Sequence, residues 1–359
     1  MKQVSVIGLD LAKQVFHVHG MSKDGGKVFS KRLQRAELPN FFKKQRACVV
    51  AMEATSSAHH WAREIEKLGH TSRLIHAQYV KPFVKRDKSD ALDAEAIAVA
   101  ATQPGMRFVA AKSAEQQATA TLMKTRTLFI RQRTSAINAL RGLLAEFGFI
   151  VPSRVVHVAK LGQILNAAKE SVPEPARAAL LSAYDHIEAI NERIGGLEKA
   201  IEEQVKLDSS IRRLMTIPGV GKITAASIRA FVPDATLFKS ARHFSSWLGI
   251  TPRSFSSGGK QAYGRISKRG NTELRTLLVV GAFTVVTAAK KHGSKNAWLC
   301  SLVNRKPYKL AAVAVANKTA RTVWAILKKG GVYQSVSLDQ DVAFAMESPE
   351  SVGRMDHQT

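Results

Sequence analysis

The stretch QVSVIGLDLAKQVFHVHGMSKDGGKVFSKRL, residues 3–33, contains three runs of strand-forming residues separated by short turns. β-Branched and aromatic residues are concentrated in the runs VSVIGLD, VFHVHGMS and KVFSKRL, and Gly25 and Gly26 separate the last two. Short connections of this kind join neighbouring antiparallel strands. The stretch therefore predicts a three-stranded antiparallel meander.

The residues that follow alternate between strand and helix patterns up to about residue 112. The continuous apolar run ACVVAMEA, residues 47–54, is typical of a buried central strand. A helix is expected from near Ser57 and another strand over residues 71–77. A second helix is expected over residues 90–102, with Ser89 at its N-cap. We therefore predict an α/β domain over residues 1–112.

Two apolar stripes at helical spacing lie in the middle of the chain. Their members are Leu122, Phe129, Ile137, Leu140, Leu144 and Phe147 in the first, and Ile187, Ile190, Ile194, Leu197, Ile201 and Val205 in the second. Such spacing places apolar side chains on one face of a helix. We predict a long antiparallel coiled-coil hairpin over residues 113–208, connected through residues 148–173, and a stripe of this kind also favours oligomers.

The chain is strongly basic. Its 359 residues include 54 Lys and Arg against 28 Asp and Glu, which gives a formal net charge of +26. Residues 209–331 contain 22 of the basic residues and only two acids, Asp234 and Glu273. This excess favours a polyanionic partner, and nucleic acid is a stronger candidate than an acidic membrane surface. We predict a basic, mainly helical domain over residues 209–333.

The cysteines and the longest apolar run indicate a cytoplasmic protein without a membrane span. Cys48 and Cys300 are far apart and lack metal-ligand spacing, so we expect two buried, unreactive thiols in a reducing compartment. The apolar run over residues 276–289 is too short and interrupted to cross a bilayer and predicts a buried helix. The polar, acidic residues 334–359 predict a disordered tail.

Four acids occupy positions that could form one site. Asp10 follows the first strand run, Glu53 ends the central-strand run, and Asp90 and Asp93 are three apart on one helix face. They could be four unconnected surface acids, but the placement at strand ends favours a shared site. Gathered carboxylates repel one another, and their oxygens suit Mg²⁺ or Mn²⁺. Two such ions can activate an attacking oxygen and stabilise the leaving oxygen in phosphodiester transfer.

Two further acids lie in the same stretch, RDKSDALDAEA at residues 86–96. Asp87 precedes the expected helix, and Glu95 falls on a different helix face from Asp90 and Asp93. We therefore expect Asp87 and Glu95 to be dispensable for metal binding.

The stretch LMTIPGVGKITAASIRAF, residues 214–231, places Pro-Gly-Val-Gly between two helical patterns and is similar to a helix-hairpin-helix. Its glycines Gly219 and Gly221 and the following Lys222 could hold a DNA phosphate at a helix N-terminus without reading bases. A plain glycine-rich turn between two helices would give the same pattern.

A second basic stretch surrounds the run SFSSGG at residues 254–259. Its candidate nucleic-acid-binding residues are Arg253, Lys260, Arg265, Lys268 and Arg269. From the residues alone, two interpretations remain open. The stretch could be a loop that binds phosphate. Alternatively, one of its serines could be a nucleophile whose phosphorane is stabilised by these cations.

The acids in IGLDLAKQVFHV, VAMEAT and KSDALDA resemble the Asp-Glu-Asp-Asp signature of the RuvC-like domain in IS110 family transposases. That family includes the Piv-type DNA invertases and the IS1111 branch. Its last two acids follow the pattern Lys-x-Asp-x-x-Asp-Ala, which corresponds here to Lys88, Asp90, Asp93 and Ala94. The stretch SSGGKQAYGRISKRGN resembles the family's serine-bearing transposase domain, and the resemblance covers nearly the whole chain apart from the tail.

The resemblance implies an RNase H-like domain whose acids Asp10, Glu53, Asp90 and Asp93 bind Mg²⁺ or Mn²⁺. It also implies a serine that becomes covalently joined to DNA. Ser257 is the matching position, with Ser256 adjacent to it. The implied partners are double-stranded donor and target DNA, a noncoding bridge RNA, and further copies of the chain in a dimer or tetramer. The implied function is transposition of an insertion sequence in the bacterial cytoplasm, at the nucleoid.

Three other functions remain possible on the sequence. The first is a metal-dependent nuclease or Holliday-junction resolvase in which water attacks and the serine only binds phosphate. The second is a site-specific DNA invertase. The third is a nucleic-acid scaffold whose acids are not catalytic.

Overall fold

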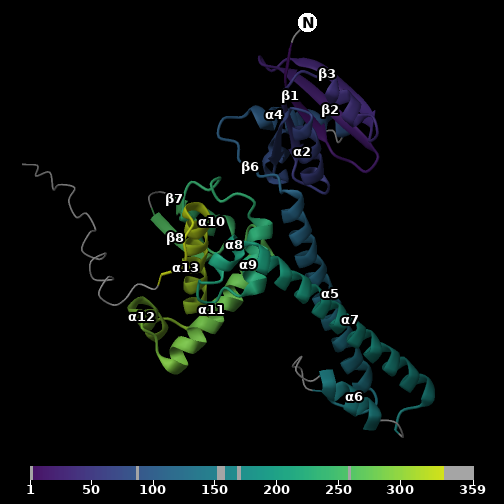
Figure 1. Ribbon diagram of the computed structural model, residues 1–359, viewed down its shortest axis with the longest axis vertical. Coiled ribbons are helices and arrows are strands. Elements are labelled where there is room, and N and C mark those ends of the chain that lie inside the picture. Colours follow the sequence, from purple (N-terminus) through teal and green to yellow (C-terminus); the bar gives the residue numbers. More distant parts are fainter. Residues whose placement is uncertain (1–2, 86–88, 152–157, 168–170, 258–259, 335–359) are drawn as a thin grey trace, which may run out of the picture. The chain divides into compact units, whose positions relative to one another are not determined.

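The computed structural model describes residues 3–85, 89–151, 158–167, 171–257 and 260–334 (Figure 1). It divides into two compact units, Met1–Gln117 and Ala118–Thr359, which are called unit 1 and unit 2 below. Unit 1 combines a sheet with helices, whereas unit 2 is mostly helical. The predicted mixed architecture is thus confirmed at this level, and it is compatible with the Asp-Glu-Asp-Asp transposase fold. Residues 335–359 of the predicted tail, which was expected to begin at residue 334, lie outside the described residues.

Unit 1 contains a six-stranded sheet in the order β3-β2-β1-β4-β5-β6. Its strands are β1 (Val4–Asp10), β2 (Val15–Ser22), β3 (Lys27–Gln34), β4 (Val49–Glu53), β5 (Thr71–Ile75) and β6 (Phe108–Val109). Strands β1, β2 and β3 form the predicted antiparallel meander. Strand β4 is the predicted central strand and runs parallel to both β1 and β5. The short antiparallel strand β6 is an addition that the sequence did not predict.

Helices cover both faces of this sheet. They are α1 (Leu38–Lys43), α2 (Ala58–Lys67), α3 (Ala77–Val80), the 3₁₀ turn η1 (Lys81–Phe83) and α4 (Asp90–Thr102). Helices α1 and α2 share one apolar core with the sheet residues Ile7, Leu9 and Phe16. On the opposite face, α4 packs on the sheet mainly through alanines. Ser89 does occupy the N-cap position of α4, but its side chain makes no capping hydrogen bond.

Unit 2 contains two long helices, as the apolar stripes predicted. They are α5 (Ala114–Ala145), which begins at the end of unit 1, and α7 (Glu174–Leu207), with the unpredicted α6 (Val158–Ala167) between them. Arg126 of α5 donates to Glu198 of α7 at 2.6 Å, and Arg133 donates to Asn191 at 3.0 Å. Residue numbers rise along one helix as they fall along the other, so these contacts join antiparallel helices. A regular coiled coil remains a prediction.

The helices in the rest of unit 2 pack around one apolar core, which includes none of the described residues of the two strands within residues 252–266. The elements of this part are α8 (Ser209–Leu214), α9 (Lys222–Phe231), α10 (Ala241–Trp247), β7 (Pro252–Ser257), β8 (Lys260–Ile266), α11 (Thr272–His292), α12 (Ala297–Arg305) and α13 (Tyr308–Lys329). The stretch for which a phosphate-binding loop was one of two interpretations contains a two-stranded antiparallel ribbon, β7–β8. Aromatic residues such as Phe255 and Tyr263 favour strands. The Ser and Gly content of the stretch obscured this signal.

Two expectations about unit 2 and the cysteines need correction. Helix α11 is longer than the apolar run that predicted it, and its length and composition would suffice to cross a membrane. One of its faces nevertheless packs in the unit 2 core through residues such as Leu278 and Val286. Both cysteines are half-buried rather than buried. Burial raises the pKa of the Cys48 thiol to about 11, which still makes it unreactive at neutral pH.

Candidate active site

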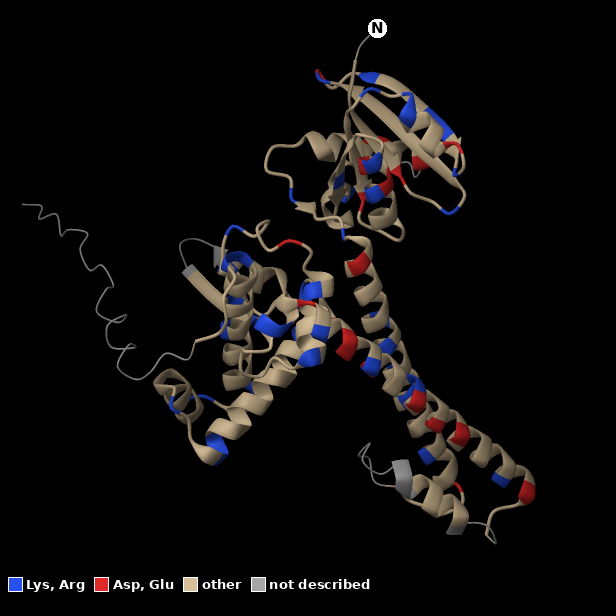
Figure 2. Cartoon of the chain, in the orientation of Figure 1, with Lys and Arg blue, Asp and Glu red and all other residues tan. Residues whose placement is uncertain are grey.

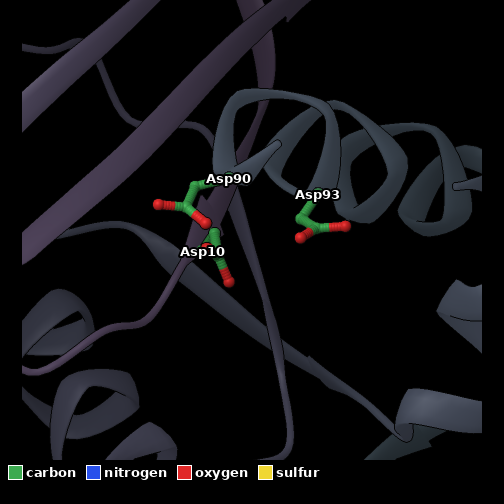
Figure 3. A group of neighbouring side chains, drawn as sticks. All are labelled: Asp10, Asp90 and Asp93. Carbon is green, nitrogen blue, oxygen red and sulfur yellow. The ribbon is translucent and has the colours of Figure 1, made fainter. Parts of the chain in front are cut away.

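Three carboxylates come together at one edge of the unit 1 sheet. One oxygen from each of Asp10, Asp90 and Asp93 lies within 4.8 Å of the other two. Figure 3 shows Asp10 beside the two acids of α4. The structure therefore brings together three of the four acids that the sequence placed in one site, although about 80 residues of chain separate Asp10 from α4.

The alternation of side chains along β1 decides which way Asp10 lies. Ile7 and Leu9 belong to the core beneath α2, so Gly8 and Asp10 lie on the opposite face, where α4 packs. An acid at the last position of the strand can thus reach the N-terminal turn of α4 while the strand itself remains buried.

Gly8 allows α4 to approach β1 more closely than any side chain would permit. A Cβ atom at Gly8 would lie 2.0 Å from the Ala94 carbonyl oxygen and 2.6 Å from the Ala98 nitrogen. The backbone of the strand is therefore in direct contact with the backbone of the helix. This contact fixes Asp90 and Asp93 beside Asp10, and the sequence reading missed it. The available signal was a glycine inside a buried strand, two residues before an acid.

The electrostatics of Asp10 reflect this crowding. Burial is the main cause that raises its pKa from 3.8 to about 6, and the charges of Asp93, Asp90 and Glu53 raise it further. A carboxyl group in this position is harder to ionise than a solvated one, and a nearby cation would favour its ionised form. The site is thus built to favour a positive ligand.

Glu53 lies on the same side of the sheet but outside the closest group. It ends β4, and Ala51 two positions earlier packs under α4, so strand alternation places Glu53 on the α4 face. Burial and then the charge of Asp93 raise the pKa of Glu53. Glu53 is therefore an electrostatic neighbour of the three aspartates, although it is not one of the three acids whose oxygens meet within 4.8 Å.

Glu95 differs from the aspartates of α4 because it has a cation of its own. Its carboxylate accepts a hydrogen bond from Lys85 Nζ at 2.8 Å, and this contact lowers the pKa of Glu95. The prediction that Glu95 stands apart from the metal site agrees with this pairing. Asp87 and Lys88 lie outside the described residues.

Two histidines border the acids, and sequence reasoning assigned neither of them to the site. His17 faces Asp10 in the β1–β2 register, and its Nε2 lies 3.8 Å from a carboxylate oxygen of Asp90. His76 follows β5, and its charge favours the ionised form of Glu53, lowering the pKa that burial raises. The register of the meander was the signal that could have pointed to His17.

In unit 2, the Pro-Gly-Val-Gly turn does connect two helices, α8 and α9. Gly219 has a φ of +81°, and a Cβ atom there would lie 2.7 Å from the Gly281 carbonyl oxygen of α11. Gly219 therefore faces another helix, whereas a Cβ atom at Gly221 would meet open space. Lys222 pairs with Glu202 at 2.7 Å. A nucleic-acid role for these three residues remains a prediction.

The β7–β8 ribbon carries the predicted serine and most of the predicted cations. The backbones of Ser257 and Lys260 pair beside the ribbon's tip, and their side chains lie outside the described residues. Arg265 is exposed on the ribbon. Arg253 is also exposed, and Lys268 and Arg269 are exposed just after β8. Basic residues are spread over unit 2 as a whole (Figure 2). Ser257 and the acids thus belong to different units.

Comparison with known proteins identifies the family. Residues 211–297 match the model of the transposase IS116/IS110/IS902 family, and residues 7–149 match the transposase model for the Asp-Glu-Asp-Asp domain of IS110 elements. A probable family 20 transposase from Pseudomonas aeruginosa is 46% identical over 92% of this chain and 99% of its own length. The chain belongs to the IS110 family of transposases.

Other relatives of this IS110 family transposase support the same assignment. The transposase for insertion sequence element IS1111A of Coxiella burnetii is 37% identical over 93% of this chain and 92% of its own length. A pilin gene-inverting protein of Moraxella lacunata is 29% identical over 45% of this chain and 55% of its own length. The chain is thus a DNA transposase or recombinase of an insertion sequence.

The acids fit what the family implies, namely DNA as the substrate and the use of a divalent metal. Asp10, Asp90 and Asp93 supply only oxygen donors, which hard divalent cations prefer. The pKa of Asp10, raised by burial and by neighbouring acids, also indicates an uncompensated negative site. The residues present therefore suit a divalent cation.

Proposed function

We propose that this IS110 family transposase cuts and rejoins DNA with two sets of residues, the acids of unit 1 and Ser257 of unit 2. The observation that carries the proposal is the convergence of Asp10, Asp90 and Asp93 on one point. Asp10, Asp90 and Asp93, with Glu53 beside them, would hold Mg²⁺ or Mn²⁺. Bound there, such an ion would stabilise negative charge on a phosphate oxygen during phosphodiester transfer.

In the serine step, the hydroxyl oxygen of Ser257 attacks the phosphorus of a DNA phosphodiester. The new bond joins this oxygen to phosphorus, the bond from phosphorus to one deoxyribose oxygen breaks, and the serine proton goes to solvent or to the leaving oxygen. The covalent product conserves the energy of the phosphodiester bond, so a second DNA hydroxyl can attack the same phosphorus, form a new phosphodiester bond and release the Ser257 oxygen, which regains a proton. Arg253, Lys260, Arg265, Lys268 and Arg269 are suited by charge to bind the flanking phosphates.

The serine step is tested by trapping a covalent protein–DNA complex on a denaturing gel with labelled element-end DNA. Wild type and Ser256→Ala are expected to give an adduct, and Ser257→Ala is expected to give none. Loss of the adduct in Ser256→Ala alone would move the nucleophile by one position. If wild type cuts DNA without any adduct, water is the nucleophile, and the protein acts as a metal-dependent nuclease or resolvase.

We also propose that the active form is an oligomer bound to a noncoding guide RNA at the nucleoid. The basic surface of residues 209–331 is of the kind that binds polyanions, and the family resemblance points to a bridge RNA and to a dimer or tetramer. Sequencing of RNA that co-purifies with the protein tests the first point, and light scattering of the purified complex tests the second. Absence of any enriched RNA from cells carrying the whole element would contradict the proposal.

The finer architecture belongs to the same proposal. Unit 1 is proposed to be RNase H-like, because an antiparallel β3-β2-β1 meander continues into parallel β4 and β5. Residues 113–208, most of which belong to unit 2, would form a coiled-coil hairpin, and residues 209–333 would form a transposase domain with a helix-hairpin-helix. The antiparallel contacts of α5 with α7 support the first assignment, and the α8–turn–α9 arrangement supports the second.

DNA inversion is an alternative outcome of the same chemistry. The pilin gene-inverting relative matches under half of this chain. Sequencing of junctions from cells that carry the element distinguishes the two outcomes, because transposition creates new insertion sites and inversion only reorients a segment.

A further inference from the structure

The segment that connects β5 to α4 borders the acid site. Strand β5 lies parallel to β4, and its last residue, Ile75, is opposite Glu53, the last residue of β4. His76 is the first residue after β5. Helix α3 and the turn η1 follow and pack against α4, the helix that carries Asp90 and Asp93. The described part of this segment, residues 76–85, thus begins just after Ile75, the β5 partner of Glu53, and packs against the helix that carries Asp90 and Asp93.

This segment presents an aromatic pair to solvent. The Tyr79 side chain is 39% exposed, although Val80 beside it is buried. The rings of His76 and Tyr79 pack edge to face with centroids 6.2 Å apart, and Nδ1 of His76 accepts a hydrogen bond from the Gln78 backbone at 3.2 Å. The two rings are therefore held in place by contacts within their own segment. Part of their surface stays exposed to solvent and does not pack in the apolar core.

The charges on the segment suit a phosphate. Lys81 is exposed, and its ammonium group forms no ion pair within the described residues. Lys85, four residues later, is instead engaged by Glu95. An aromatic surface next to a free cation is the combination that binds the base and the phosphate of one nucleotide.

We propose that His76 and Tyr79 form a stacking platform for an unpaired DNA base next to the phosphate processed at the acid site, with Lys81 bound to the adjoining phosphate. The proposal rests on the proposed function, because it takes DNA to be the strand held by the acids. To the proposed function it adds a preference of the protein for DNA that is locally unpaired beside His76 and Tyr79.

The physical reason for that preference is the way aromatic rings bind bases. In a duplex the faces of a base are covered by its neighbours, so an exposed ring can stack only on a base that has left the helix. Such stacking depends little on the identity of the base. A platform beside the acids would thus hold the strand open and in register without reading sequence.

The test measures binding of the full chain to two DNAs of equal length in Ca²⁺. One is fully paired, and the other has one unpaired 2-aminopurine. Tyr79→Ala is expected to reduce the preference for the unpaired DNA about tenfold, the effect of losing one stacked base. Tyr79→Phe keeps the ring and should stay within twofold of wild type. Gln78→Ala, an exposed neighbour without a ring, is the matched control.

The outcomes separate this proposal from the function on which it rests. Binding of Mn²⁺, followed by electron paramagnetic resonance, should be unchanged in Tyr79→Ala and lost in Asp10→Asn, which also shows that the Tyr79 variant is folded. Equal preference in Tyr79→Ala and wild type, or an equal loss in Tyr79→Phe, would overturn the platform. Failure of wild type to bind Mn²⁺ would instead count against the acid site.

Discussion

In both units a glycine lets two backbones touch, and the contacts at Gly8 and at Gly219 have different consequences. In unit 1, Gly8 of β1 lies against Ala94 and Ala98 of α4, and the contact gathers negative charges. In unit 2, Gly219 lies against Gly281 of α11, and the nearest side chain at that contact is the apolar Val285. A glycine in the sequence thus marks a close approach, but it does not say whether the neighbour is a ligand or another part of the protein.

The largest effect expected from this comparison concerns the acids themselves. Asp10→Asn, Asp90→Asn and Asp93→Asn should each reduce strand cleavage and recombination by about a thousandfold, because each removes a charge from the shared site. Glu95→Gln is the control on the same helix, and it should retain activity within a few fold because Glu95 pairs with Lys85. Excision of a marked element in cells measures both. An equal loss of activity in Glu95→Gln would contradict the assignment of Asp90 and Asp93, but not Glu95, to the shared site.

The second prediction sets the two glycines against each other. Gly8→Ala should reduce activity about a hundredfold while leaving every acid in place, because a displacement of α4 by about 1 Å misplaces Asp90 and Asp93. Gly219→Ala should destabilise unit 2 by about 2 kcal/mol or more, because its φ is positive and its Cβ would meet the Gly281 oxygen. It should leave Mn²⁺ binding unchanged. Excision assays, chemical denaturation and metal titration of the two variants provide the comparison.

Gly196→Ala is the control for both substitutions. Gly196 lies inside α7, and a Cβ atom there would meet open space. Alanine should therefore stabilise the helix by about 0.5–1 kcal/mol. If Gly8→Ala bound Mn²⁺ as tightly as wild type, the backbone contact would not be what positions the acids.

The smallest effect expected is a dependence of stability on pH. The pKa of Asp10 is raised to about 6 in the fold, so folding favours its protonated form. Without divalent cations, this contribution is complete below about pH 4 and is lost as the pH rises through 6. Asp10→Asn should therefore be more stable than wild type at pH 8, by on the order of 2 kcal/mol, and equal to it near pH 4. Urea denaturation in chelator measures this, and Mg²⁺ should stabilise only wild type.

The elements of unit 1 could be predicted because each depends on local pattern. The meander, the central strand β4 and helix α4 follow from β-branched runs, a Gly-Gly turn and a serine at the N-cap position. Strand β6 has two residues, Phe108 and Val109, and exists only because β5 offers it an edge. Such a strand has no signal of its own.

The candidate site could be predicted in part for the same reason. The sequence places acids at strand ends and on one helix turn, but the helix can reach the strand only through the contact at Gly8. That contact joins residues about 90 positions apart, and the acids that raise the pKa of Asp10 lie about 40 to 80 positions from it in the chain. In unit 2, the side of Gly219 that seemed open to a phosphate is filled by α11, a partner that no local pattern reveals.

The contact between Gly8 and α4 also has a consequence for the order of synthesis. Strands β1 to β3 can pair as soon as they leave the ribosome, since their contacts are local. The acid site cannot exist until α4 has emerged and settled on β1, near the end of unit 1. A nascent chain that ends before Asp90 therefore carries Asp10 and Glu53 without the partners that would let them hold a cation. The three aspartates thus come together only after almost all of unit 1 has been made.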